Sequence, residues 1–216
     1  MIPLIDSLSS NFLPALLTGV SVDFEIAGIA LALGLALGVL LAFARSQGGV
    51  AGIGAGLIVG LMRAAPTFVV MFFLLNTLPR GGMSGIMIVA VSLVPYAAAY
   101  VADSAVDALR QLHSGSPLIC LLILPNIARA FFVLVMSSSA GAAIGVPEGV
   151  AVILRQAEKM PSTGNTLVVF VIGVACFGIP LHAGFALMRL IQRHLGRVAL
   201  RKQEGALTGR KMVTAK

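Results

Sequence analysis

The residues that could do chemistry in this chain are few, and most of them lie inside long apolar segments. Two arginines interrupt these segments, Arg63 and Arg129, and the uncharged polar groups within them include Asn76, Ser92, Ser137, Ser138, Ser139, Asn165 and His182. No Ser, His and Asp stand in an order typical of nucleophilic catalysis, and no Walker or Gly-rich nucleotide motif is present. We therefore expect hydrogen bonding and charge along a path through an apolar medium, with no enzyme activity and no metal or cofactor bound by this chain.

The composition excludes a water-soluble enzyme. The chain has 216 residues, of which 58% are hydrophobic and 11% charged, and its mean hydropathy is +1.02. A soluble domain carries about 25% charged residues. The two cysteines, Cys120 and Cys176, lie in apolar runs and suggest neither a metal site nor a redox pair.

The formal charge of +7 lies in one C-terminal segment. Residues 189–216 contain eight Lys and Arg and one acid, whereas residues 1–188 are neutral. We predict a transmembrane permease domain over 1–188 and a basic cytoplasmic tail over 189–216. Arginines at every fourth position from Arg189 to Arg201 predict an amphipathic helical start on membrane lipids, followed by disordered chain. The tail has no aromatic residue, so we expect no nucleic-acid partner.

Five apolar segments are long enough to cross a bilayer, which takes about 20 residues each. The first is residues 26–44, and the second joins residues 46–62 and 64–78 across Arg63. The other three are residues 81–102, 117–139 and 161–188. Splitting the second segment at Arg63 gives six spans instead. The loop charges favour five, with the acidic N-terminus outside and the basic tail inside, because Lys and Arg stay on the cytoplasmic side.

Small residues recur at every fourth position in the first two segments. One ladder is Ala30, Gly34, Gly38 and Ala42, and the other is Gly48, Gly52, Gly56 and Gly60. Four-residue spacing keeps each ladder on one helix face, where missing side chains let two helices approach closely. We predict a helix–helix seam along these glycines, with a merely permissive glycine-rich segment as the alternative.

Several polar residues could serve transport, each with a simpler alternative. Tyr96 and Tyr100 share one helix face and could line a polar path or act as interface anchors. Asn76 needs a hydrogen-bond partner in hydrocarbon. Arg129 could gate the path or hold a carboxylate, or it could extend toward the lipid headgroups.

Four motifs in order resemble one membrane-protein family. They are Leu61-Met62-Arg63-Ala64-Ala65-Pro66, Ala98-Ala99-Tyr100-Val101-Ala102-Asp103, Ile123-Leu124-Pro125-Asn126-Ile127-Ala128-Arg129 and Ile144-Gly145-Val146-Pro147-Glu148. Together they are similar to the inner-membrane permease subunits of binding-protein-dependent ABC importers, in the polar amino-acid branch. The resemblance covers about residues 16–195 and adds Arg63 and Pro66 to the candidates for the translocation path or its gate.

The resemblance also implies a cytoplasmic loop that docks into an ATPase subunit. The best match is the segment from Asp107 to His113, which includes Ala108, Leu109 and Leu112. His113 stands at the position of the family's glycine, and Gly115 would take that position if the register shifts by two residues. We expect a short amphipathic helix between two spans. An ordinary solvated loop is the alternative, because the interval between Asp103 and Ile123 is shorter than the family uses.

The resemblance implies a bacterial inner-membrane permease subunit that forms the translocation path for an amino acid. Its expected partners are an ABC ATPase that binds ATP, an extracytoplasmic solute-binding protein and a second permease subunit, identical or paralogous. The alternatives are a divergent subunit without ATPase coupling, a stand-alone small-solute transporter on the same scaffold, and an intramembrane enzyme.

Overall fold

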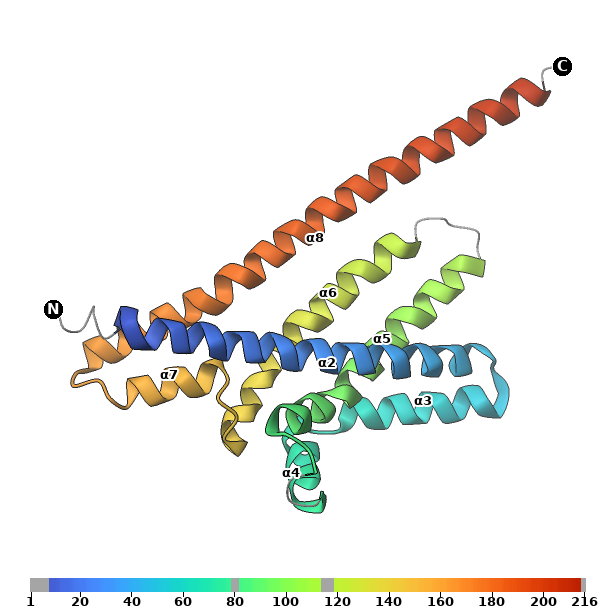
Figure 1. The fold of residues 1–216 in the computed structure, drawn as a ribbon. Helices are drawn as coiled ribbons and strands as arrows, with labels where there is room; N and C mark the ends of the chain where they lie inside the picture. The colour runs from blue at the N-terminus through green and yellow to red at the C-terminus, as the bar shows by residue number, and fades with distance from the viewer. Residues whose placement is uncertain (1–7, 79–81, 114–118, 215–216) are drawn as a thin grey trace.

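The architecture is a set of packed helices. The computed structural model describes residues 8–78, 82–113 and 119–214, and every element in these ranges is helical. In Figure 1, α2 lies across the molecule beside α3, the hairpin of α5 and α6 crosses it, and α8 extends alone beyond the rest. The all-α class predicted from the sequence is confirmed.

The first long helix, α2 (Leu13–Ser46), follows a short π-helix, η1 (Leu8–Phe12). Its 34 residues give a length of about 50 Å. That exceeds the hydrocarbon thickness of about 30 Å, so α2 must tilt or extend beyond the bilayer core. The chain then reverses at Gly48 and Gly49, whose φ angles of 69° and 57° favour glycine.

The second predicted span is a bent pair of helices. Helix α3 (Gly49–Ala64) ends where Ala65 and Pro66 adopt extended backbone, because a proline disfavours helix at the residue before it. Helix α4 (Thr67–Thr77) continues at 91° to α3. Both are too short to cross a bilayer alone, which does not support the six-span alternative. By length and composition the described residues hold four spans, or five if the bent pair counts as one.

The remaining helices complete the set. Helix α5 (Gly85–His113) and helix α6 (Ile119–Ser137) each contain a proline, Pro95 and Pro125. A 3₁₀-helix, η2 (Ser138–Ile144), leads to the short helix α7 (Gly149–Ala157). Helix α8 (Thr163–Thr214) is continuous through the predicted boundary at residue 188 and ends within the segment predicted as a tail. The division into a permease domain over 1–188 and a basic tail over 189–216, with its disordered end, stays a prediction.

The ladder of small residues on α2 forms the central seam with α5. Ala30 and Ala42 are fully buried, and a Cβ added to Gly38 would lie 2.7 Å from the carbonyl oxygen of Ala98. Such a separation is shorter than a van der Waals contact, so only glycine fits at this crossing. The predicted close helix–helix approach exists here, between the first and the third apolar segments.

The second ladder, on α3, does not form such a seam within this chain. Gly48 belongs to the turn, and Gly56 and Gly60 face open space, with no atom within 4 Å of an added Cβ. Only Gly52 approaches α2, at 3.2 Å from the carbonyl oxygen of Arg45. The small residues of α2 face α5 and not the glycines of α3, so the seam expected along Gly48, Gly52, Gly56 and Gly60 stays a prediction.

Leucine substitutions should separate the two ladders. We expect Gly38→Leu to lower the stability of the purified chain by about 1–3 kcal/mol, since the added atoms overpack the α2–α5 seam. Gly56→Leu, the matched control on α3, should leave the thermal unfolding temperature in detergent unchanged. An equal loss of stability in both variants would contradict the assigned seam.

Candidate functional site

Two arginines and one aspartate join three helices at the candidate translocation site. Arg45, at the end of α2, donates from Nη1 to Oδ1 of Asp103 on α5 at 2.7 Å. Arg63, in the last turn of α3, donates from Nη2 to the other carboxylate oxygen, Oδ2. The side chains are 28%, 37% and 60% exposed for Arg45, Asp103 and Arg63. One carboxylate therefore partly neutralises two cations at a site where charges are costly.

A pocket of about 370 Å³ opens beside this ion-pair network. Its lining residues are Arg63, Tyr96, Ala99, Tyr100, Asp103, Ser104 and Asp107. All but Arg63 come from α5, where spacings of three, four and seven residues place side chains on one helix face. The pocket thus has a polar wall. One face of α5 and the end of α3 supply its residues, which come from separate parts of the sequence.

The two tyrosines form the apolar part of this wall. Their ring centroids lie 6.3 Å apart, with 31° between the ring planes, and both residues are half-buried. Tyr96 lies 11 residues after Gly85 and Asp103 lies 18 residues after it. At 1.5 Å per residue, the pocket therefore runs from about half the bilayer depth toward the end of α5. Aromatic rings and charges along this length can bind a small polar solute.

The structure unites three of the predicted path residues, Arg63, Tyr96 and Tyr100, and leaves the others elsewhere. Pro66 caps α4 at the bend. Asn76 is exposed on α4, and its amide donates to the carbonyl oxygen of Phe72 at 2.7 Å. Arg129 lines a different pocket, between α6 and α8. The hydrogen-bond partner expected for Asn76 is therefore supplied by its own helix.

The predicted docking segment is the end of α5 rather than a separate helix. Asp107, Ala108 and Leu109 continue α5, which runs through Leu112 and ends at His113. Asp107 lines the pocket, and Ala108 is buried. Gly115 lies outside the described residues. The expectation of a short helix held between two spans is corrected for the described part of this segment.

Arg45 and Asp103 are functional candidates that sequence reasoning did not select. In the sequence, Arg45 is a loop charge after the first apolar segment, and Asp103 is the last residue of the second motif. A usable signal existed, since charges at span ends in a charge-poor body need partners. Arg45 and Asp103 follow directly after the first and third apolar segments, and Arg63 interrupts the second.

A second polar cluster joins the beginning of α2 to α7. Asp23 on α2 accepts from the Ser138 hydroxyl at 2.5 Å and from the Gly149 backbone N–H at 2.9 Å. Glu148 caps α7 by accepting from the N–H groups of Val150 and Ala151, each at 2.7 Å. Both carboxyl groups are fully buried. The cluster fixes the connection between α6 and α8 against the first span.

Burial raises the pKa of Glu148 to about 7; the nearby Asp23 carboxylate also raises this pKa, whereas the backbone donors of Val150 and Ala151 lower it. The folded-state pKa of Glu148 lies above the unfolded value of 4.5, so the folded chain binds more protons than the unfolded chain at pH values between these two pKa values. The contribution of Glu148 to the free energy of unfolding is therefore fully present below pH 4.5 and is lost as the pH rises through 7.

Thermal unfolding at several pH values tests this dependence. We expect stability to fall by up to about 3 kcal/mol between pH 4.5 and 8 in the wild type. Glu148→Gln keeps an oxygen that caps α7 but cannot titrate, so its pH profile should be flatter. A glutamine variant with the wild-type slope would contradict the assignment.

Two solved structures share the fold of this chain. The crystal structure of an amino acid ABC transporter with histidines matches with a TM-score of 0.69 and 18% identity, over 84% of this chain and 94% of that chain. An inward-facing MetNI methionine ABC transporter matches with a TM-score of 0.61 and 19% identity, over 84% and 98%. No protein-family model and no curated protein matches the chain.

At these identities the matches define the fold alone. The chain is an all-α, multi-pass membrane protein with an ABC importer permease-like fold. The general resemblance predicted from the four motifs is therefore confirmed at the level of the fold.

Proposed function

We propose that this chain is the membrane-spanning permease subunit of an ABC importer for a polar amino acid or a similar small polar solute. The observation that carries the proposal is the pocket in which Arg63, Tyr96 and Tyr100 meet beside the Arg45–Asp103–Arg63 network. A permease performs no bond chemistry and needs only such a polar path. The chain would form that path in a bacterial inner membrane.

The same helix that lines the pocket could connect it to an ATPase. Asp103 and Asp107 lie one turn apart on α5, and α5 continues to His113 at the predicted docking segment. A rigid helix would carry a displacement of its end directly to the ion pairs that hold α2 and α3. ATP would be bound by the partner ATPase and not by this chain. The other expected partners are an extracytoplasmic solute-binding protein and a second permease subunit.

One observation favours the alternative of a non-coupled subunit on this scaffold. The described part of the docking segment holds no separate helix, since α5 simply extends through Asp107 to its end at His113. An ATPase would have to recognise the end of α5 instead.

Purification and reconstitution distinguish these functions. We expect the tagged chain, extracted from its native membrane, to retain a stoichiometric ATPase subunit. We further expect the complex in proteoliposomes to take up radiolabelled amino acids only when ATP and the binding protein are present. Uptake without ATP would favour a stand-alone transporter, and a retained ATPase without uptake would contradict the importer.

A further inference from the structure

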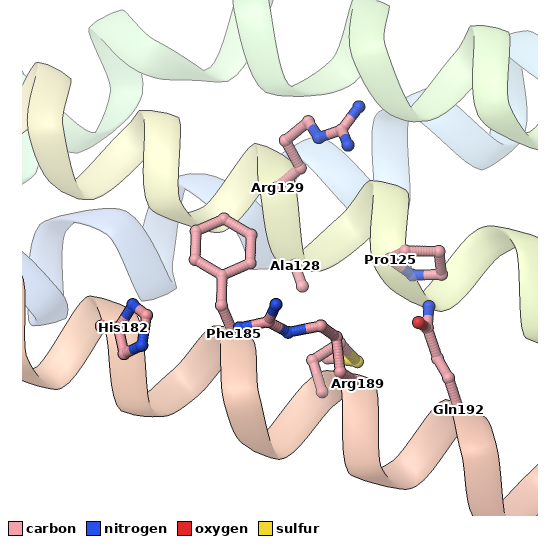
Figure 2. A pocket seen from close by; sticks show the side chains of 8 residues that line it. Pro125, Ala128, Arg129, His182, Phe185, Arg189 and Gln192 are labelled. Atoms are coloured by element: carbon pink, nitrogen blue, oxygen red, sulfur yellow. The ribbon is translucent and has the colours of Figure 1, made fainter.

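A second pocket, of about 340 Å³, lies between α6 and α8 and is not used by the proposed path. Its polar lining comes from Arg129 on α6 and from His182, Arg189 and Gln192 on α8. In Figure 2, Arg189 extends from α8 toward α6, whereas Arg129 leaves α6 on the side away from α8. Arg189 is thus the charged group that enters the space between the two helices.

The walls of this pocket carry positive charge without acids to balance it. Helix α6 contains no Asp or Glu, and α8 contains only Glu204, 15 residues beyond Arg189. That separation is about 22 Å along a helix, which is too far for an ion pair. Among the described side chains, the ion pairs involve Arg45 and Arg63 and neither Arg129 nor Arg189. The pocket therefore suits an anion.

The length of α8 places this pocket at the level of lipid headgroups. His182 and Gln192 lie 19 and 29 residues after Thr163, where α8 begins. At 1.5 Å per residue they lie about 28 and 44 Å along the helix, at or beyond the far side of a hydrocarbon core about 30 Å thick. This is also the end of α8 that carries the basic tail, which the positive-inside rule assigns to the cytoplasmic leaflet.

The pocket also offers an apolar surface beside its charge. Phe185 of α8 packs on Phe132 of α6, with ring centroids 4.0 Å apart, and closes the space between the helices. Leu187, Leu190 and Ile191 are exposed on the neighbouring surface of α8. An amphipathic ligand could place its polar group near Arg189 and its chains along these residues.

We propose that the α6–α8 pocket binds the phosphate group of an anionic phospholipid from the cytoplasmic leaflet. Arg189 and Gln192, about one helical turn apart, donate hydrogen bonds to the phosphate oxygens. His182 lies two turns deeper, at the level of the lipid ester groups, and Arg129 adds positive potential from α6. The lipid links α8 to α6 at the headgroup level, where a basic side chain is attracted to an anionic lipid.

Lipid titration of the full purified chain in neutral detergent tests the proposal. We expect phosphatidylglycerol to bind at least about tenfold more tightly than zwitterionic phosphatidylcholine in native mass spectrometry. Arg189→Gln should weaken phosphatidylglycerol binding by about tenfold or more, because it removes a charge-assisted hydrogen bond. The matched control Arg193→Gln removes an exposed charge on the same helix outside the pocket, and should cost less than about fivefold. Gln192→Ala, which keeps all charges, should also weaken binding.

Three outcomes would overturn the proposal. Equal losses in Arg189→Gln and Arg193→Gln would indicate diffuse attraction to the membrane surface. Displacement of the lipid by millimolar inorganic phosphate would indicate a site for a free anion. Cross-linking of Met188→Cys to a second copy would make the pocket a subunit interface. None of these measurements depends on transport, so their failure leaves the proposed function untouched.

Discussion

Asp103→Asn is expected to abolish ATP-dependent uptake and to loosen the junction of α2, α3 and α5. The substitution keeps the shape of the side chain but removes the charge that both Arg45 and Arg63 contact. Two unpaired arginines would then repel each other beside the pocket and would turn toward water or lipid headgroups. The three side chains are partly exposed, so we expect a loss of stability of only about 1–2 kcal/mol. The loss of transport should be far larger than the loss of stability.

Asp107→Asn is the matched control for this prediction. Asp107 lies one turn further along the same face of α5 and lines the same pocket, but it forms no ion pair with any described side chain. Its variant should retain the wild-type unfolding temperature and measurable uptake in proteoliposomes. If Asp103→Asn transported at the wild-type rate, the ion-pair network would have no role in translocation.

The part of this site that could be predicted from the sequence rests on helical periodicity. Tyr96 and Tyr100 are four residues apart, and any helix places them on one face, so their shared wall followed from local spacing. Arg63 lies beside these tyrosines because α3 ends just after it, and this position could not be read from helical spacing. That end is set by Pro66, but the 91° bend that follows has no signature in composition.

The parts that could not be predicted depend on contacts between distant segments. The spacing of Gly34 and Gly38 indicates a close approach but does not say which helix approaches, and the partner is α5 rather than α3. Asp23 and Ser138 are separated by 115 positions in the sequence. Nothing local at Asp23 distinguishes a topological charge outside the membrane from a buried hydrogen-bond acceptor.

The buried position of Asp23 leads to the second large effect, on folding. Asp23→Leu should destabilise the chain by about 3 kcal/mol or more, because it leaves the Ser138 hydroxyl and the Gly149 N–H buried without their acceptor. The leucine side chain would also lack space, because residue 23 packs tightly against Gly149. A Cβ added at Gly149 would lie only 2.9 Å from Oδ2 of Asp23. We expect low yield and early thermal unfolding in detergent.

Asp23→Asn separates the hydrogen bonds from the charge. The asparagine oxygen can accept from only one of the two donors, the Ser138 hydroxyl or the Gly149 N–H, so the other donor loses its acceptor. The asparagine amide can donate to the Glu148 carboxylate, which removes the repulsion between two buried acids. This variant should therefore lose about 1–2 kcal/mol near neutral pH, less than Asp23→Leu, because one buried donor lacks an acceptor. It should also lower the pKa of Glu148 and shrink the pH dependence of unfolding. If asparagine were as damaging as leucine, the negative charge of Asp23 itself, and not its role as an acceptor, would hold α2 to α7.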